Sequence, residues 1–311
     1  MKTIISQVDK AILEKELTKD IFVRDTNNGR NQIYIFTHDQ APNLMHEVGR
    51  LREYTFRAAG GGTGKESDID AYDIAETPFK QLIVWNPRDK EIVGGYRYLC
   101  GKSVALNKNG QPKSPTSKLF KFSEPFMKDY WPHTFELGRS FVQPLFQPMV
   151  NLRKGMYSLD NLWDGLGAIA ILKPEMKYYF GKITMYPKFD RFARDLILFF
   201  MHKYFPDKET LVSPYNPLKL TTSVKALNDV FTGENYDENY KILSKKVRGL
   251  KENIPPLVNA YMNVSPSMKT FGTSVNLAFG DVEETAIIIT IDDIYDYKRE
   301  RHMESFKQNK E

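Results

Sequence analysis

The sequence predicts an α/β fold in which a mixed sheet carries helices on both faces. Three observations lead to this prediction. Two hairpin signals come first along the chain, a strand–helix–strand–helix unit follows in the middle, and 20 Phe with 17 Tyr among 311 residues supply enough aromatic surface for a large core. We therefore expect one continuous domain over residues 1–297, followed by a charged, frayed tail over residues 298–311.

The first part of the chain alternates helical and hairpin signals. The turn sequences Asn27-Asn28-Gly29 and Asn86-Pro87-Arg88-Asp89 each join two β-type runs, and apolar positions recur at helical spacing around them. The expected elements in chain order are a helix at 6–19, strands at 21–24 and 32–37, a helix at 42–59, a loop at 60–78, and strands at 79–85 and 91–99.

The strand–helix–strand–helix unit opens the second part of the chain. Ser158 is the candidate N-cap of its first helix, and Pro174 stops that helix before the next strand begins. The expected elements are a strand at 134–142, a helix at 159–172, a strand at 178–185, helices at 189–204, 224–231 and 237–250, and apolar runs at 274–279 and 285–291.

Composition excludes several classes of protein. No apolar run reaches the roughly 18 residues that a membrane-spanning helix needs, and the N-terminus lacks the apolar core of a signal peptide. The single cysteine, Cys100, excludes a disulfide framework, and the 5 histidines show no metal-ligand spacing. A net charge of +5 is too mild to indicate a nucleic-acid partner. We therefore expect a cytoplasmic protein without a bound metal.

Basic residues gather in two stretches, 102–128, with six lysines and one acidic residue, and 241–251. A solvated surface is the ordinary explanation of such stretches. The alternatives are contact with an acidic protein partner or peripheral contact with the anionic inner surface of a membrane. The sequence leaves these explanations open.

The segment Gly60-Gly61-Gly62-Thr63-Gly64-Lys65 resembles a phosphate-binding loop only superficially. That motif needs Gly at position 59, where Ala stands, and Ser or Thr at position 66, where Glu stands. The segment also follows a predicted helix instead of a strand. A glycine-rich chain without side-chain packing is instead typical of a mobile lid.

Seven candidate site residues share one property, which is that each stands close to apolar positions that a fold would bury. Charged groups in such places are costly unless they are paired, so they indicate a site. The candidates are Arg52 and Phe56, four apart on one face of the helix at 42–59; Asp70 and Asp73 in the following loop; Arg97 in the strand at 91–99; and Glu136 and Arg139 in the strand at 134–142.

Glu136 and Arg139 conflict with a regular strand, because residues three apart point to opposite faces. A β-bulge near Gly138 inserts one residue and brings both side chains to one face, while it turns a backbone N–H out of the ladder. A free N–H beside a buried acid suits the polarisation of a carbonyl oxygen. The alternative is a surface ion pair on an edge strand.

The seven residues, in this order, resemble the signature of the autoinducer-synthase branch of the GNAT acyltransferases, which contains acyl-homoserine-lactone and N-acyl amino acid synthases. The closer similarity is to the ornithine-lipid and glycine-lipid N-acyltransferases, often labelled hemolysins, and among these to the Bacteroidota members. It covers residues 50–293. It rests on four further motifs: ELGRS at 136–140, LWDGL at 162–166, YFG at 179–181 and IPPLVNAY at 254–261.

The resemblance implies a GNAT-type, mostly antiparallel sheet flanked by helices. It also implies an enzyme of aminolipid biosynthesis that moves a 3-hydroxy fatty acyl group from a thioester to the amine of a small amino acid, glycine above all. The amine attacks directly, without a covalent enzyme intermediate. Glu136 is then the candidate base, and Arg97 or Arg139 is the candidate partner of the substrate carboxylate.

The other matched residues receive supporting roles through the resemblance. Asp70 and Asp73 are expected to order the lid and the helix that carries Arg52 and Phe56. Trp163, with its apolar neighbours, is the candidate wall of a slot for the alkyl chain, although core packing explains this side chain as well.

The expected donor is acyl carrier protein, with acyl-CoA as the alternative, and no cofactor is bound permanently. The CoA pyrophosphate loop of GNAT enzymes is not clean here, because the nearest segment is Arg153-Lys154-Gly155-Met156. A phosphopantetheine arm carries one phosphate, which Arg153, Lys154 and Gly155 can bind together with a helix N-terminus at Ser158. Carrier proteins are acidic, so the lysines of residues 102–128 gain a docking role.

Three other functions remain open. A homoserine-lactone-type synthase would use S-adenosylmethionine as the acceptor. The hemolysin label suggests a membrane-damaging protein, although the sequence shows no membrane span. A GNAT module without activity would only bind acyl carrier protein, and the presence of Glu136 with both Arg97 and Arg139 argues against it.

Overall fold

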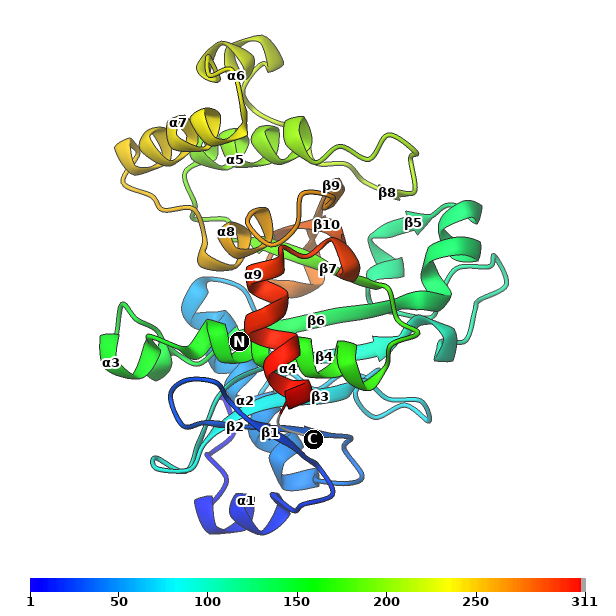
Figure 1. The fold of residues 1–311 in the computed structure, drawn as a ribbon, viewed down its shortest axis with the longest axis vertical. Coiled ribbons are helices and arrows are strands. Elements are labelled where there is room, and N and C mark those ends of the chain that lie inside the picture. The colour runs from blue at the N-terminus through cyan, green and yellow to red at the C-terminus, as the bar shows by residue number, and fades with distance from the viewer. Residues whose placement is uncertain (309–311) are drawn as a thin grey trace.

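The computed structural model describes residues 1–308, and its centre is an eight-stranded sheet with the order β1-β2-β3-β4-β6-β7-β10-β9 (Figure 1). Neighbouring strands are antiparallel except β6 and β7, which run parallel. The strands are β1 Phe22–Asp25, β2 Gln32–Phe36, β3 Lys80–Asn86, β4 Glu91–Cys100, β6 Thr134–Val142, β7 Tyr178–Met185, β9 Lys269–Asn276 and β10 Val282–Thr290; β5 Phe120–Phe122 and β8 Val212–Pro214 form a separate pair.

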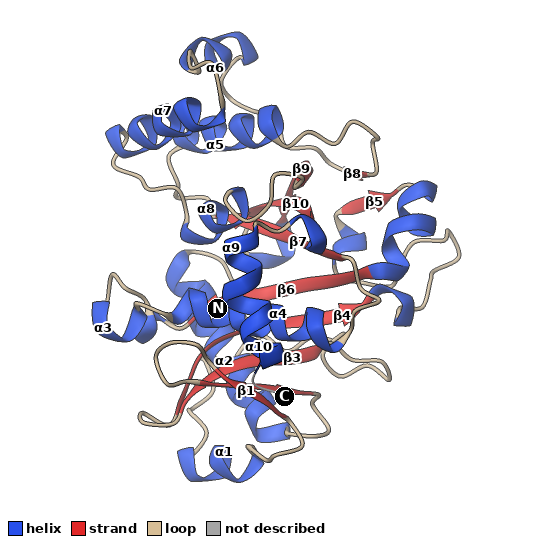
Figure 2. Ribbon diagram, in the orientation of Figure 1, coloured by secondary structure: helices blue, strands red, loops and turns tan. Residues whose placement is uncertain are grey.

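Helices cover both faces of this sheet (Figure 2). Side chains alternate along β3, so Ile83 packs with α2 on one face while Leu82 and Val84 pack with α4 on the other. The helices are α1 Lys10–Glu16, α2 Pro42–Ala59, α3 Leu152–Gly155, α4 Ser158–Leu172, α5 Arg191–Tyr204, α6 Val224–Val230, α7 Tyr236–Gly249, α8 Pro256–Met262, α9 Asp296–Arg299 and α10 Ser305–Gln308. Within residues 1–308, no helix is both long enough and apolar enough to cross a bilayer.

The parallel strands β6 and β7 pair over only three residues. Thr134, Phe135 and Glu136 face Tyr178–Phe180, and the ladder stops there although both strands continue. Beyond Glu136, β6 pairs with β4 alone, so the backbone of residues 137–142 has no strand partner on its other side. The sheet therefore opens at its centre, immediately after Glu136.

Two apolar clusters lie apart on the face that carries α2. One surrounds α2, with Phe36 and Ile83 among its members, and the other surrounds Phe180 and Ile288 beneath β5. The strand order places β4 and β6 between these two clusters. The charged side chains that β4 and β6 carry on this face therefore have an apolar cluster on each side.

The structure corrects two of the expected helix boundaries. The first helix begins at Lys10 instead of residue 6, because Lys2 and Ile5 donate backbone hydrogen bonds to the loop at 64–66 and hold the preceding chain extended. Ser158 is the first residue of α4 and not its N-cap, which is Tyr157. The Ser158 hydroxyl donates to the Phe146 carbonyl at 2.8 Å instead of capping the helix.

The expected frayed tail is wrong for residues 298–308, while residues 309–311 lie outside the described part of the chain. Residues 298–308 form short helical segments that pack on α4, where His302, Met303 and Phe306 are buried. The His302 ring contacts the Asp164 carboxylate at 2.7 Å. A side chain at Gly167 would meet the His302 carbonyl at 2.3 Å, so the glycine permits this close approach. Long-range packing thus orders a segment whose composition alone suggested exposure.

Candidate active site

The β-bulge expected near Gly138 is confirmed. Gly95 pairs with Phe141 and Arg97 pairs with Gly138, so β6 carries one more residue than β4 between these two pairs. The strained position is Arg139, with φ 51°, and not the glycine beside it. The extra residue brings Arg139 to the same side of the sheet as Glu136 and Arg97.

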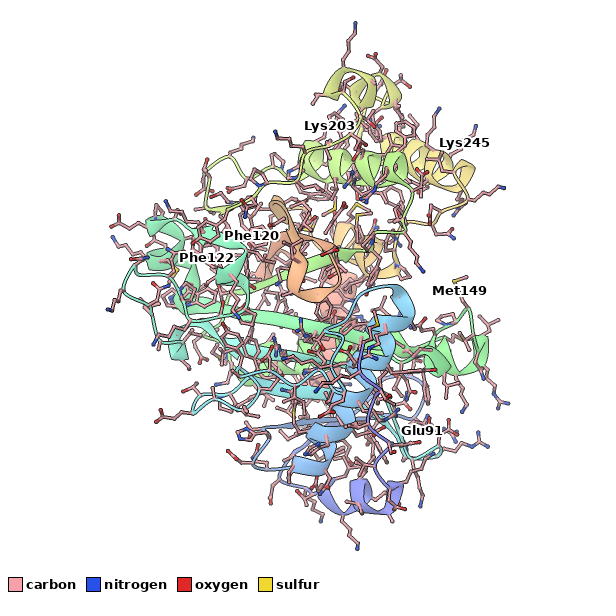
Figure 3. All side chains as sticks on the ribbon, turned by 180° about the vertical axis from the view of Figure 1, so that it is seen from behind. Glu91, Phe120, Phe122, Met149, Lys203 and Lys245 are labelled. Atoms are coloured by element: carbon pink, nitrogen blue, oxygen red, sulfur yellow. The ribbon has the colours of Figure 1, made fainter. Side chains whose placement is uncertain are left out.

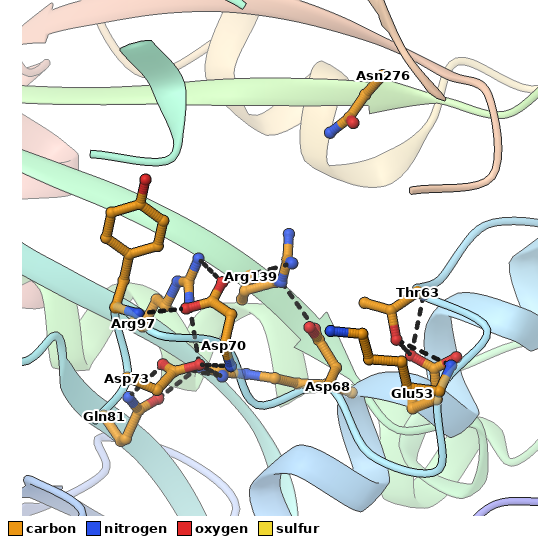
Figure 4. Close-up of polar contacts among 12 residues, drawn as sticks. Glu53, Thr63, Asp68, Asp70, Asp73, Gln81, Arg97, Arg139 and Asn276 are labelled. Atoms are coloured by element: carbon orange, nitrogen blue, oxygen red, sulfur yellow. Dashed lines mark hydrogen bonds and ion pairs between the residues drawn. The ribbon is translucent and has the colours of Figure 1, made fainter. Parts of the chain in front are cut away.

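The buried carboxylate of Asp73 binds two of the predicted arginines. It is part of a set of ion-paired residues that we call the arginine network: Arg52, Arg97, Arg139, Asp68, Asp70 and Asp73. Its carboxylate accepts from Arg52 at 3.3 Å, from Arg97 at 2.9 Å and from the Gln81 amide at 3.0 Å (Figure 4). Burial opposes ionisation of this carboxyl, but the Arg52 and Arg97 charges outweigh that effect and hold the pKa of Asp73 well below its usual value. The expected link from the loop to the Arg52 helix is therefore present.

Arg97 has no free side for a substrate. Its second terminal nitrogen lies 2.9 Å from Asp70, and its guanidinium stacks on the Phe79 ring at 4.7 Å. The side chain is 2% exposed. The carboxylates of Asp73 and Asp70 outweigh burial and raise its pKa, so this arginine is a permanent cation locked inside the network.

Arg139 closes the network on its outer side. Its Nε lies 2.7 Å from the Asp68 carboxylate, its terminal nitrogen is 3.9 Å from Asp70, and its guanidinium stacks on the Phe279 ring at 4.2 Å. Phe56 supports that ring edge-on at 5.2 Å. Figure 4 shows the Arg139 head group at the edge of the network, on the side of Asn276. Unlike Arg97, it keeps part of its guanidinium accessible.

Glu136 lies beside this network, but it forms no ion pair with any of the three arginines. Three guanidiniums, from Arg52, Arg97 and Arg139, face three aspartates, so none is left over for Glu136. One carboxylate oxygen of Glu136 accepts from the Thr116 hydroxyl at 2.6 Å, and the other is buried with no hydrogen bond shorter than 3.5 Å among the described residues, although the Ser114 hydroxyl and the Lys182 and Arg97 charges favour the ionised form. Burial raises the pKa of Glu136 above the usual glutamate value. A buried acid of this kind is suited to accept and return a proton.

The glycine-rich loop is held on α2 by the buried carboxylate of Glu53. It accepts from the Thr63 backbone at 3.0 Å, from the Thr63 hydroxyl at 2.7 Å and from the Gly64 backbone at 2.8 Å. The N–H groups that a phosphate would need therefore already bind an internal anion. Movement of the loop as a lid stays a prediction.

The other predicted site residues do not lie beside Glu136. Trp163 is on α4, on the opposite face of the sheet, with its ring edge-on to Tyr261 at 5.8 Å. The phosphate candidates lie around α3. Lys154 pairs with Asp89 at 2.7 Å, and Gly155 packs so tightly against Pro148 that a side chain would meet its backbone at 2.3 Å. Arg153 on α3 is exposed, and the Ser158 hydroxyl is already bound to the backbone.

Three further residues belong to the site, although none of them was among the predicted site residues. Asp68, the partner of Arg139, stands in the same acidic run as Asp70, so the run itself was the signal. Thr116 comes from the basic stretch at 102–128, where nothing in the sequence singled it out. Lys182 pairs with Glu284 at 2.7 Å on the face that holds Glu136, and a lone lysine inside an apolar strand was a usable signal.

An open centre in a mostly antiparallel sheet, with a buried carboxylate at the opening, agrees with the match to known families. Residues 51–153 match the acetyltransferase (GNAT) domain, so this part of the chain is a domain of the GNAT acyltransferase class. Among solved structures, FeeM, an N-acyl amino acid synthase from uncultured soil microbes, aligns with a TM-score of 0.37 at 9% identity, over 90% of this chain and 99% of that chain.

Two curated relatives define the family more narrowly. The chain is 53% identical over 312 residues to the glycine N(alpha)-acyltransferase of Phocaeicola vulgatus, covering 100% of this chain and 96% of the relative. It is 54% identical over 306 residues to the glycine N(alpha)-acyltransferase of Bacteroides thetaiotaomicron, covering 98% of this chain and 91% of the relative. The chain belongs to this glycine N(alpha)-acyltransferase family and is an enzyme. The resemblance found in the sequence is confirmed.

Proposed function

We propose that the enzyme transfers a 3-hydroxy fatty acyl group from the thioester of acyl carrier protein to the amine of glycine, as a step of aminolipid biosynthesis. The observation that carries this proposal is Glu136, a buried carboxylate that forms no ion pair within 4 Å among the described residues, at the point where β6 and β7 part. The names of both curated relatives support glycine as the acceptor.

Glu136 acts as the base in this proposal. The amine of an amino acid is mostly protonated at pH 7, and its lone pair is free only after a proton leaves. The unpartnered oxygen of Glu136 takes that proton. The amine nitrogen then attacks the thioester carbon, the C–N bond forms, the C–S bond breaks, and the sulfur leaves as a thiol with the second proton that the amine nitrogen loses.

The free edge of β6 supplies the stabilisation of the developing oxyanion. Residues 137–142 have no strand partner opposite β4, and the bulge at Arg139 turns the backbone there. An N–H that already points at the carbonyl oxygen stabilises the negative charge without reorganisation. We assign this role to the backbone between Gly138 and Phe141.

Arg139 is the better of the two candidates for the glycine carboxylate. Arg97 spends both terminal nitrogens on Asp70 and Asp73, whereas Arg139 binds Asp68 mainly through Nε. A guanidinium with free terminal nitrogens can bind a carboxylate by two parallel hydrogen bonds. Arg97 then has a positioning role.

The basic stretch at 102–128 supports a carrier protein as the donor. All six of its lysines are exposed, and the same stretch delivers Thr116 to Glu136, so a partner docked there would lie next to the base. For the pantetheine phosphate, Arg153 and the N-terminus of α4, which no side chain caps, remain the candidates. Lys154 and Ser158 would first have to release their present partners.

The test is lipid mass spectrometry of a bacterial host that expresses either the wild type or Glu136→Gln. The expected result is N-acylated glycine with a 3-hydroxy acyl chain in the wild-type extract alone. Folded wild-type enzyme without any new N-acyl amino acid would refute the proposal, and a different N-acyl amino acid would refute glycine only. In vitro, turnover with acyl carrier protein should fall as salt rises, because surface charges are screened beyond about 8–10 Å. Equal, salt-independent turnover with acyl-CoA would refute the donor.

A further inference from the structure

An unusual concentration of exposed apolar side chains lies between β6 and α4. Residues 145–157 contain six of them, and we call this segment the apolar edge: Leu145, Met149, Val150, Leu152, Met156 and Tyr157. Met149 is 94% and Leu152 is 68% exposed. Elsewhere along the described residues, large exposed apolar side chains come singly or in pairs. A cluster of this kind on a soluble surface marks an interaction site.

The backbone of the apolar edge is fixed, so the fold holds these side chains outward. Phe146 is buried, and its carbonyl accepts from the Ser158 hydroxyl at 2.8 Å. Asn151 caps α3 by accepting from the Lys154 N–H at 3.0 Å, and the Gln147 amide donates to the Val142 carbonyl at 2.7 Å. These bonds anchor both ends and the middle of the segment. Exposure here is therefore a feature of the folded chain.

The apolar edge lies at the margin of the molecule, with basic side chains in it and near it. Figures 1 and 3 show α3 at the margin of the molecule and Met149 projecting outward from it. The segment contains Arg153 and Lys154 and no acidic residue. Exposed Arg88 neighbours Asp89, the ion-pair partner of Lys154, and exposed Arg30 follows Gly29, which packs near Tyr157. Projecting apolar side chains within a basic rim fit a bilayer with anionic headgroups.

We propose that the apolar edge docks the enzyme on an anionic phospholipid surface, with Met149, Val150 and Leu152 entering the interface and the neighbouring arginines contacting the headgroups. To bind these projecting side chains, a carrier protein or a second copy of the chain would need a concave apolar surface. Strand β6 runs directly from Glu136 into this segment, so docking brings the open edge of the sheet towards the membrane. The proposal does not depend on the reaction that the site performs.

Vesicle sedimentation without substrate tests the proposal, with vesicles of phosphatidylcholine alone and with an equal share of phosphatidylglycerol. Leu152→Glu is the test variant and Val224→Glu is its control, because both residues open a helix and are 68% and 66% exposed. We expect the wild type and Val224→Glu to bind the mixed vesicles, and Leu152→Glu to bind them on the order of tenfold more weakly. Thermal melting should show that both variants fold.

Tryptophan fluorescence gives a second measurement. In Met149→Trp, the added emission should shift to the blue with mixed vesicles and less with phosphatidylcholine alone. The proposal is overturned if the wild type ignores mixed vesicles or if Leu152→Glu binds them as well as the control does. It is also overturned if Leu152→Glu loses only carrier-protein binding or only self-association. None of these outcomes bears on whether glycine is acylated.

Discussion

Replacing Asp73 by Asn tests whether the arginine network is a structural core. Asp73 is completely buried and accepts from Arg52, Arg97 and Gln81. The amide keeps the size of the side chain but leaves three guanidiniums facing two carboxylates. Removing one partner of a buried ion pair costs about 3–5 kcal/mol, because the other charge stays buried and unpaired. We expect the free energy of unfolding to fall by that amount.

Asp70→Asn is the matched control. The Asp70 carboxylate is 26% exposed, pairs with Arg97 at 2.9 Å and lies 3.9 Å from Arg139. Water can replace part of what it contributes to Arg97, so its loss should cost less than the loss of Asp73. The two substitutions make the same chemical change three residues apart, and they differ in the burial of the carboxylate and in the number of its side-chain partners.

Urea unfolding over a range of pH supplies the assay. The pKa of Asp73 is lowered in the fold, so its stabilisation is present above the unfolded value of about 3.9 and is lost as pH falls through the folded value. The difference in the free energy of unfolding between the wild type and Asp73→Asn should stay constant from pH 7 to 5 and become smaller in stronger acid. A gap below about 1 kcal/mol at pH 7, or one that widens in acid, would refute the network as a structural core.

Three further outcomes are expected. Glu136→Gln should lower kcat about 10²–10⁴-fold in a donor-thiol release assay. An unchanged kcat would disprove the role of Glu136 as the base. Burial raises the pKa of Glu136, so the folded wild type loses stability as pH rises and this side chain ionises. The free energy of unfolding of Glu136→Gln should therefore rise relative to that of the wild type at higher pH. Arg139→Lys should raise the KM for glycine more than it lowers kcat, and an unchanged KM would move the carboxylate site elsewhere. Phe306→Ala should cost about 3–5 kcal/mol in urea unfolding, since its ring is 2% exposed, whereas a negligible loss would show that the tail does not stabilise α4.

Local signals in the sequence were sufficient to predict an element where the residues at its ends mark its start and its stop. Helix α2 starts at Pro42 and ends at Ala59, and the next residue, Gly60, has a φ of 98°, the left-handed conformation that glycine favours after a helix. The bulge was also local information, because Glu136 and Arg139 cannot share a face without one extra residue. Both features follow from spacing within a few residues.

The partners of the site residues could not be predicted in the same way. Arg139 binds Asp68, 71 positions away by numbering, and not Glu136, three positions away, because the loop after α2 folds across the sheet. Thr116 reaches Glu136 from an irregular stretch whose path no periodic pattern describes. The tail packs on α4 because Gly167 admits the His302 backbone. Each contact depends on register and packing between distant segments.

The residues of the seven-residue signature therefore fall into two groups, one that stabilises the fold and one that is available for chemistry. Arg52, Asp70, Asp73 and Arg97 neutralise one another in a buried position, which holds β3, β4 and the loop in place but leaves them little to offer a substrate. Glu136 stands outside that set, with one buried oxygen that accepts no hydrogen bond shorter than 3.5 Å among the described residues, and for this reason we propose it as the proton acceptor. A resemblance that rests on these residues identifies the class of reaction. Our proposals for the donor and for membrane contact rest instead on the lysines of residues 102–128 and on the exposed apolar side chains of residues 145–157, which lie outside the signature.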